Sequence, residues 1–448
     1  MSLPPVFAAS ALYDNLLQTA LRQFFSRATF ETEPIPSQSS DGRLAIEETS
    51  DPSVLSIRWF GMRHVIHVPN RRPFTSHEVR LAKAIGRVLA ARYRAIFDPK
   101  QMLERGELFR GAIEDRYIGA FLDDAGREPR AVARADVAAN AIEVLRVAAL
   151  SSYENHAISS GVLLLEGETD PIRAHPVEDA HVYRYTSALT GIKSFYRLCD
   201  GLRTLFLVNS SGSVLDLVEV SRYARPSGLD VPGPSTYRFH ALATEGTRNL
   251  CIVLTPSHEI KVIAEGTQTF SFRNARWHLL DMEAKYQIWS ESVGNGPLAE
   301  RLFQTALDLA DAREGALFVV LRDADASLPQ LVAPGDQLAA MRVSTTDVPS
   351  RAQLMHMLRG RTATELDPAV LAGLARTDGA TVMDAGGRLL AVGAILLHTE
   401  PPEPHSNLVV EGARTTAAMA AGRHGPVLKV SEDGLITFYD QQERIWDI

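Results

Sequence analysis

The same order of segments occurs twice in this chain of 448 residues. In both copies a helical pattern is followed by a buried-strand pattern, an Asp-Gly pair, a hairpin, a Glu-Gly-x-Arg run and two strand patterns. The first copy spans residues 137–264 and the second spans residues 298–439. Such alternation is typical of α/β units in which helices flank mixed sheets. We therefore expect an internal duplication of about 150 residues; a chance agreement between two α/β units is the alternative.

The first copy departs from the second at both of its polar motifs. Asp200-Gly201 is followed by Leu202, whereas Asp378-Gly379 is followed by Ala380. After Gly246-Thr247-Arg248-Asn249 the chain passes directly into an apolar strand pattern at 250–254. We therefore expect the helix that belongs to this motif to be short or absent, and the first copy to be degenerate.

In the second copy, Asp378 stands at the start of a predicted strand. Its carboxylate oxygens are the ligands that Mg²⁺ and Mn²⁺ prefer, and Gly379 would let a ligand approach the backbone closely. The alternative is structural, because Asp-Gly is also a common turn dipeptide.

A second polar run, which contains Gly412, Arg414, Thr415 and Thr416, precedes a segment rich in alanine. Free N–H groups at the start of a helix favour anions, and the planar guanidinium of Arg414 suits phosphate. An ordinary helix cap explains the same residues. Together with Asp378, the run predicts a site for nucleotide phosphates.

The order of these motifs resembles the diadenylate cyclase (DAC) domain family, from roughly Pro297 to the last residue. That family carries an Asp-Gly-Ala motif, then a Gly-Thr/Ala-Arg-His-Arg-Ala-Ala type of motif, and then a strand followed by Ser-Glu. Here the three motifs are Asp378-Gly379-Ala380, the run from Gly412, and Ser431-Glu432. The family usually has a histidine where this chain has Thr415.

The resemblance implies a DAC-like fold, and condensation of two ATP molecules to cyclic di-AMP and pyrophosphate with Mg²⁺ or Mn²⁺. It implies catalytic roles for Asp378 and Arg414, with Asp378 as the metal ligand. Contacts with the nucleotide are implied for the remaining motif positions: Gly379, Ala380, Leu396, Gly412, Thr415, Thr416, Ser431 and Glu432. For Leu396, simple burial in the core is the alternative.

The missing histidine leaves a second function open, that of a catalytically impaired nucleotide-binding sensor or pseudoenzyme. A purely structural assembly protein is a third. In the family two DAC domains face each other, so we expect a homo-oligomer or intrachain pairing of the two copies.

The N-terminal residues 1–112 predict a sensor-like α/β domain, ahead of a degenerate DAC-like domain at 113–285 and a DAC domain at 286–448. Thr75 and Glu78 form a capping-box pattern before a long amphipathic helix. His64 and His67 would point to opposite faces of a strand, so a shared metal ion is not expected.

The net charge of −8 argues against nucleic acid as a partner. No apolar run is long enough to span a membrane, and the first residues carry no signal-peptide pattern. The two cysteines, Cys199 and Cys251, lie in apolar segments and suggest a reducing cytoplasm.

Overall fold

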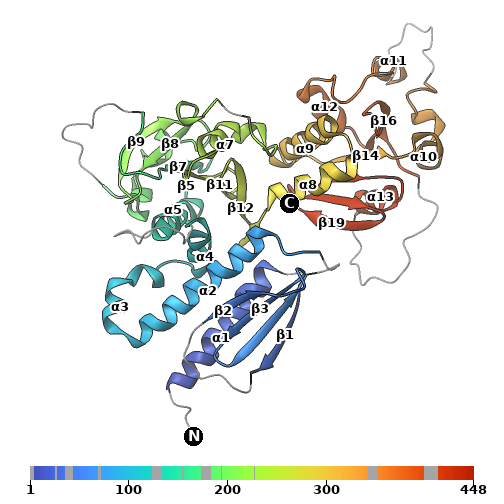
Figure 1. The fold of residues 1–448 in the computed structure, drawn as a ribbon. Coiled ribbons are helices and arrows are strands. Elements are labelled where there is room, and N and C mark those ends of the chain that lie inside the picture. The colour runs from blue at the N-terminus through green and yellow to red at the C-terminus, as the bar shows by residue number, and fades with distance from the viewer. Residues whose placement is uncertain are drawn as a thin grey trace. The chain divides into compact units, whose positions relative to one another are not determined.

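The computed structural model divides into two compact α/β units, in which mixed or antiparallel sheets are flanked by helices as the sequence predicts (Figure 1). The first unit comprises Met1–Gly228 and Phe239–Asp281, and the second comprises Leu229–Arg238 and Met282–Ile448. The expected division into three domains stays a prediction. The structure describes residues 5–25, 28–35, 44–68, 72–123, 134–153, 156–172, 183–192, 194–226, 228–341, 351–397 and 412–448.

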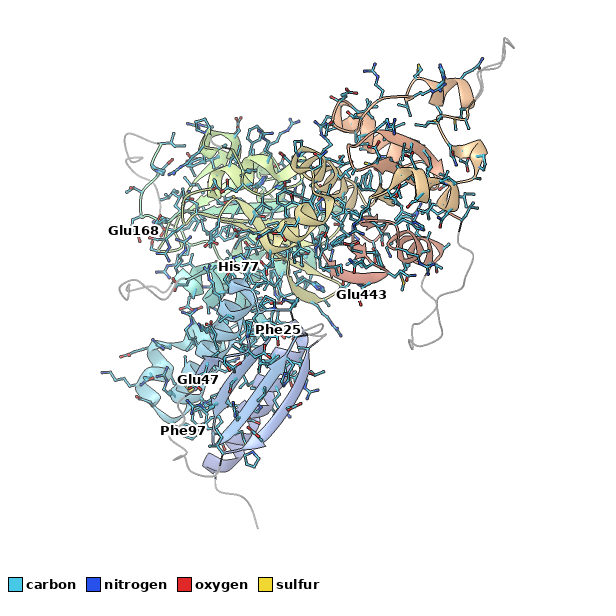
Figure 2. The ribbon with its side chains drawn as sticks, turned by 45° about the vertical axis from the view of Figure 1, so that its right-hand side comes forward. Phe25, Glu47, His77, Phe97, Glu168 and Glu443 are labelled. Atoms are coloured by element: carbon cyan, nitrogen blue, oxygen red, sulfur yellow. The ribbon has the colours of Figure 1, made fainter. Side chains whose placement is uncertain are left out.

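The N-terminal part of the first unit is an antiparallel sheet packed against α1 (Pro5–Phe24) and α2 (Ser76–Phe97). Its strand order is β1-β4-β3-β2. The strands are β1 (Thr29–Pro34), β2 (Ala45–Glu48), β3 (Val54–Trp59) and β4 (Met62–His67). Figure 2 shows the side chains of this part, with Phe97 at the end of α2.

Two sequence predictions for this sheet and its helix are confirmed. Thr75 and Glu78 form the reciprocal capping box at the start of α2. His64 is buried and contacts Asp14 at 2.7 Å, whereas the side chain of His67 is 37% exposed, so the two rings lie on opposite faces of β4. Strand β1 was missed because nearly all of its residues are exposed and polar, a pattern typical of a loop.

A seven-stranded sheet forms the rest of the first unit, in the order β13-β12-β11-β10-β7-β8-β9. Strands β7 and β8 run parallel, and every other neighbouring pair is antiparallel. Its strands are β7 (Ser160–Leu164), β8 (Thr204–Val208), β9 (Val214–Glu219), β10 (Leu250–Leu254), β11 (Ile260–Ala264), β12 (Thr267–Arg273) and β13 (Arg276–Leu279).

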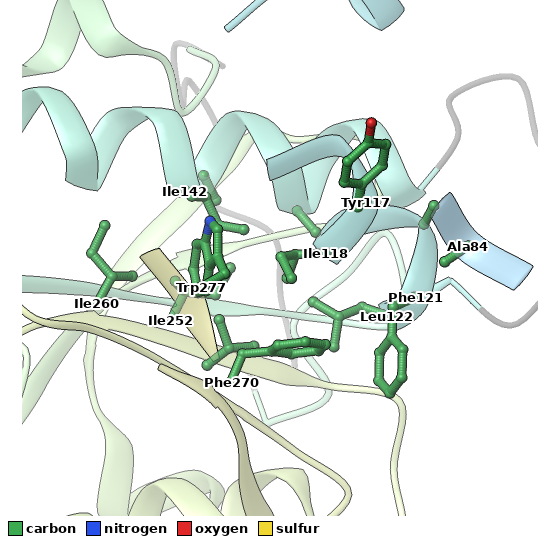
Figure 3. Close-up of a cluster of buried hydrophobic side chains, with 14 of the residues drawn as sticks. Ala84, Tyr117, Ile118, Phe121, Leu122, Ile142, Ile252, Ile260, Phe270 and Trp277 are labelled. Carbon is green, nitrogen blue, oxygen red and sulfur yellow. The ribbon is translucent and has the colours of Figure 1, made fainter. Parts of the chain in front are cut away.

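Helices α4 (Ile113–Leu122) and α5 (Arg134–Ala149) pack against each other beside this sheet. Figure 3 shows side chains of the two helices meeting those of the strands, with Ile118 and Phe121 beside Phe270 and Trp277. The core is therefore continuous from α4 to the sheet.

The second unit has a six-stranded sheet in the order β16-β15-β14-β17-β18-β19, with β14 and β15 parallel. Its strands are β14 (Ala316–Leu321), β15 (Ala380–Asp384), β16 (Leu389–Ala394), β17 (Val427–Val430), β18 (Ile436–Asp440) and β19 (Glu443–Asp447). The helices are α8 (Met282–Val293), α9 (Gly296–Asp311), α10 (Ala324–Leu331), α11 (Arg351–His356), α12 (Pro368–Ala375) and α13 (Ala413–Ala421).

Helices cover both faces of this sheet. On one face Trp289 of α8 packs edge-on against Phe438, with ring centroids 5.3 Å apart. On the other face α13 buries Ala418 and Ala421 in a cluster with Tyr439. Since successive residues of a strand face opposite sides, Phe438 packs on the face that α8 covers and Tyr439 on the face that α13 covers.

The two larger sheets share strand order and direction. The run β9-β8-β7-β10-β11-β12 corresponds to β16-β15-β14-β17-β18-β19, with the parallel pair at the same place. Asp200 and Asp378 each precede the second strand of that pair. This agreement supports an internal duplication, which we keep as a proposal.

One correspondence between the two copies is wrong. No helix follows Gly246 in the first copy, as expected, and the helix of this copy, α7 (Arg238–Thr244), lies before Gly246. Gly246 has φ +59° and follows the helix, as a glycine that ends a helix does. Gly246 and Arg248 therefore do not occupy the positions of Gly412 and Arg414, which stand at the start of α13.

Among the helices that the structure describes, none combines the length and the apolar character needed to cross a membrane.

Candidate functional site

Asp378 and Arg414, which lie in separate sequence motifs, are brought together in the second unit. Nη2 of Arg414 is 3.9 Å from Oδ1 of Asp378, and Nη1 donates a hydrogen bond of 3.2 Å to Oε1 of Glu432. The Asp378 side chain is fully exposed, and that of Glu432 is 74% exposed. Ion pairs as exposed as these contribute little to stability, so a ligand could displace them at little cost.

Two strands and a helix bring these side chains to one edge of the sheet. Asp378 comes just before β15, Arg414 lies in the first turn of α13, and Glu432 comes just after β17. Because β17 runs antiparallel to β14 while β15 runs parallel to it, the end of β17 lies at the same edge as the start of β15.

Gly315, the residue before β14, belongs to this site and was missed from the sequence. A Cβ atom added there would lie 2.1 Å from Nη1 of Arg414, so the guanidinium lies directly on the glycine backbone. The sequence offers no signal for this contact, because a single glycine before a strand has many ordinary explanations.

Lys429 of β17 is the second missed residue. Its Nζ donates a hydrogen bond of 2.7 Å to Oγ1 of Thr415, which is 5% exposed beneath the first turn of α13. A lysine inside the strand pattern Val427–Val430 was the only available signal. Two cations, Arg414 and Lys429, thus accompany the positive end of a helix, a combination that attracts anions.

The glycines of the two motifs serve different purposes. Gly379 has φ +110°, and a Cβ atom there would lie 2.6 Å from the carbonyl oxygen of Ala394, so the backbone itself requires glycine. Gly412 is exposed at the N-cap of α13, and its carbonyl accepts from the Thr415 N–H.

The remaining predicted residues fall into two groups. Ala380 and Leu396 are buried in the hydrophobic cluster that α13 covers, as the core alternative for Leu396 anticipates. Thr416 is half-buried in α13, and Ser431 begins a tight turn in which its carbonyl accepts from the Gly434 N–H. Contacts of these four residues with a nucleotide stay predictions.

The acidic residues fit a metal held jointly with a ligand. Among the residues that the structure describes, no group of three or more His, Cys, Asp or Glu side chains could hold a metal ion alone. Mg²⁺ is usually bound through one or two carboxylates together with substrate phosphates. The fully exposed carboxylate of Asp378 suits that arrangement.

Asp200, at the matching position in the first unit, makes hydrogen bonds within its own turn. Oδ1 of Asp200 accepts hydrogen bonds from the backbone N–H groups of Leu202, Arg203 and Thr204, at 2.9, 2.8 and 2.9 Å. Partial burial alone would raise the pKa of Asp200, but these donors outweigh it and lower the pKa. Asp200 therefore holds its own turn together.

No protein-family model matches the sequence, and no curated protein matches it. Among solved structures, the chain is similar to a hypothetical membrane spanning protein from Bacillus cereus, with 20% identity and a TM-score of 0.23. That match covers 34% of this chain and 62% of the other, which is less than two thirds of its length. The chain is also similar to a double mutant of DacA from Staphylococcus aureus, with 19% identity and a TM-score of 0.21, over 34% of this chain and 86% of the other. Neither score is high enough to support an argument about fold or function.

Proposed function

We propose that the second unit binds ATP and condenses two ATP molecules to cyclic di-AMP, with release of two pyrophosphates. The observation that supports this most directly is the convergence of Asp378 and Arg414 at one sheet edge, 3.9 Å apart. A carboxylate beside a guanidinium offers a metal ligand and a phosphate ligand in one place.

In the proposed reaction, the 3′-hydroxyl of each ATP attacks the α-phosphate of the other. Each attack forms one phosphodiester bond, and the hydroxyl loses its proton as one pyrophosphate leaves. Arg414 and Lys429 would neutralise phosphate charge, and Asp378 would help to orient the hydroxyl. Mg²⁺ or Mn²⁺, held by Asp378 and the phosphates, would supply further charge neutralisation when bound. Catalysis of this kind depends mainly on positioning and electrostatic stabilisation.

The experiment is incubation of the full chain with ATP and Mn²⁺, followed by mass spectrometry for cyclic di-AMP. We expect product from the wild-type chain and none from Asp378→Asn. Asp325→Asn, an exposed carboxylate on α10 of the same unit, is the matched control and should retain the wild-type rate. Equal product from Asp378→Asn and the wild type would rule out the assignment of Asp378.

A second candidate function, nucleotide binding without turnover, is favoured by one observation. Thr415 stands where the resembling family has histidine, yet its hydroxyl is buried and accepts from Lys429. It therefore presents no group to a ligand at the sheet edge. This candidate predicts that the chain binds ATP in calorimetry while the mass spectrum shows no cyclic dinucleotide.

A further inference from the structure

A cavity of about 430 Å³ lies in the first unit, at the end of the seven-stranded sheet opposite to Asp200. At this end β7 finishes, β10 begins and β11 turns into β12. Arg80 of α2 and the last residues of α4 also line the cavity. Its volume falls in the range of small-molecule sites. The run Gly246–Asn249 of the first copy lines it, and none of the residues predicted for the nucleotide site of the second copy belongs to it.

At the corresponding place in the second unit, an ion pair joins the ends of two strands. Arg322, directly after β14, bonds both carboxylate oxygens of Asp440, at the end of β18, at 2.7 Å. In the first unit the matching strands β7 and β11 are followed by Glu166 and Glu265, two residues of like charge that both line the cavity. Two carboxylates do not form such an ion pair with each other, and the cavity lies at this edge.

The groups around the cavity are held in place. The Arg80 Nε donates to the Phe121 carbonyl at 2.8 Å, its guanidinium lies 4.5 Å from the centre of the Phe121 ring, and Nη1 is 3.3 Å from Glu265. Asn249 fixes the facing loop, because Oδ1 accepts from the Glu166 N–H and Nδ2 donates to the Ala243 carbonyl. A site with fixed walls loses little entropy on binding.

The charges that line the cavity are balanced, with Arg80 and Arg248 against Glu166 and Glu265. Arg248 forms an ion pair with Asp123, whose Oδ1 lies 3.8 Å from Nη2, a distance too long for a hydrogen bond. An anionic ligand would face the two glutamates, and a cationic ligand would face the two arginines. A zwitterion satisfies both signs, since a guanidinium binds carboxylate and a carboxylate binds ammonium.

The apolar part of the wall indicates what the rest of the ligand is. Phe121 and Leu122, both labelled in Figure 3, line the cavity together with Leu250 and Ala264. We propose that this cavity binds a free α-amino acid, with its carboxylate on Arg248, its ammonium on Glu166 and its side chain against Phe121 and Leu122. This proposal does not depend on the function proposed for the second unit.

The test uses the full chain and the common L-amino acids, each added separately at millimolar concentration in a thermal-unfolding assay. We expect at least one of them to raise the Tm, because a ligand that binds only the folded state stabilises it. Calorimetry then gives its Kd for the wild type and for Arg248→Ala and Glu166→Gln. Each variant should weaken binding about tenfold or more, since each removes a charge-assisted hydrogen bond.

Two controls make the result specific. Arg276→Ala removes an exposed arginine of β13 outside the cavity, and it should leave the Kd unchanged. Analogues of the bound amino acid that lack either the amino or the carboxyl group should bind far more weakly. The proposal fails if no amino acid raises the Tm, if the analogue without the amino group binds equally well, or if Arg248→Ala has the wild-type Kd.

Discussion

At the scale of single residues, the position of Arg414 depends on Gly315, which has no side chain. Its guanidinium occupies the space that a Cβ atom of Gly315 would fill. From there the guanidinium reaches Glu432 and comes within 3.9 Å of Asp378. Gly315 thus determines the position of the guanidinium that we propose to bind phosphate.

We expect Gly315→Ala to weaken ATP binding while leaving the stability of the fold nearly unchanged. The clashing atoms are the far end of a flexible side chain, so Arg414 should move aside and the unfolding free energy should change by less than about 1 kcal/mol. ATP binding should weaken about tenfold, because a charge-assisted bond is lost. Calorimetry and urea unfolding of the same sample measure the two effects.

Gly373→Ala is the matched control for that variant. Gly373 lies in α12 with nothing within 4 Å of the added methyl group, so ATP affinity should not change. If Gly315→Ala bound ATP as tightly as the wild type, the assigned position of Arg414 in the site would be wrong.

The sequence predicted some site residues and not others for a physical reason. Asp378 and Arg414 have chemistry that suits phosphate and metal, so their residue types alone made them candidates. Gly315 and Lys429 matter only through their neighbours, Arg414 and Thr415. Such neighbours depend on strand register, which the residues themselves do not reveal.

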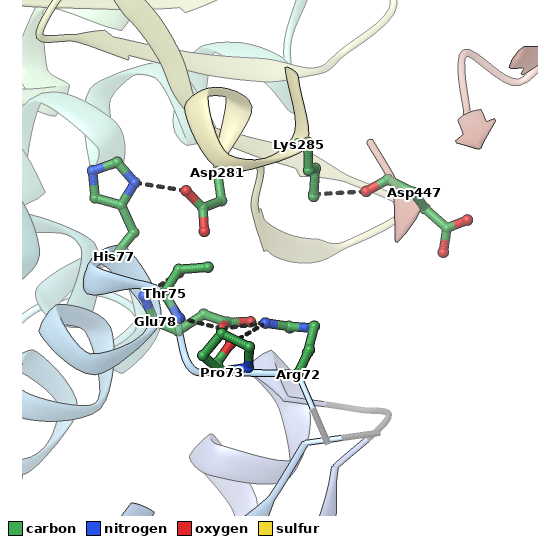
Figure 4. A network of polar contacts seen from close by, with 8 residues as sticks. All are labelled: Arg72, Pro73, Thr75, His77, Glu78, Asp281, Lys285 and Asp447. Atoms are coloured by element: carbon green, nitrogen blue, oxygen red, sulfur yellow. Dashed lines mark hydrogen bonds and ion pairs between the residues drawn. The ribbon is translucent and has the colours of Figure 1, made fainter. Parts of the chain in front are cut away.

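At the scale of elements, the N-terminus of α2 is fixed from two sides. Glu78 closes the capping box and also accepts from both terminal nitrogens of Arg72 (Figure 4). His77 contacts Asp281 through Nδ1 at 2.9 Å. This pair joins α2 to the end of the first unit, 204 residues further along the chain.

The His77–Asp281 pair predicts a pH-dependent stability. The hydrogen bond to Asp281 raises the pKa of His77, although burial and Arg80 oppose it. Stability from a raised pKa is fully present below the unfolded value of about 6.5 and is lost as pH rises through the folded value. We expect His77→Gln to cost about 1 kcal/mol at pH 6, and less at alkaline pH.

Urea unfolding of the wild type and His77→Gln across that pH range measures this difference. His278→Gln, on β13 of the same unit, is a comparison that leaves the Asp281 contact in place. A difference between wild type and His77→Gln that stays constant with pH would contradict the account.

The elements that the sequence predicted well are those with strong periodicity and buried apolar runs. Helix α2 has a capping box and a buried face, and β7, β10 and β14 are buried throughout. Helix α7 was not predicted, because its seven residues are too short to show a helical period. In such a segment, position is decided by tertiary packing.

At the scale of the whole molecule, the two copies differ at the site. In the second unit the Asp378 carboxylate is fully exposed, whereas in the first unit Asp200 is engaged by three backbone N–H groups. Each chain would therefore contain a single competent site, and condensation of two ATP molecules would require two chains to meet.

This predicts that the initial rate of cyclic di-AMP formation per chain rises with chain concentration in the dilute range. Mass spectrometry of timed samples gives the rate, and light scattering gives the mass of the particles. A monomer whose rate per chain is independent of concentration would contradict pairing between chains.

The central claim is that Asp378 and Arg414 hold the same triphosphate, and calorimetry with 3′-deoxy-ATP tests it most directly, because this analogue lacks the attacking hydroxyl. We predict that Mn²⁺ tightens its binding to the wild type and to Asp325→Asn, that Asp378→Asn loses this gain, and that Arg414→Ala weakens binding about tenfold with or without the metal. Wild-type affinity and an undiminished Mn²⁺ effect in both Asp378→Asn and Arg414→Ala would contradict the account.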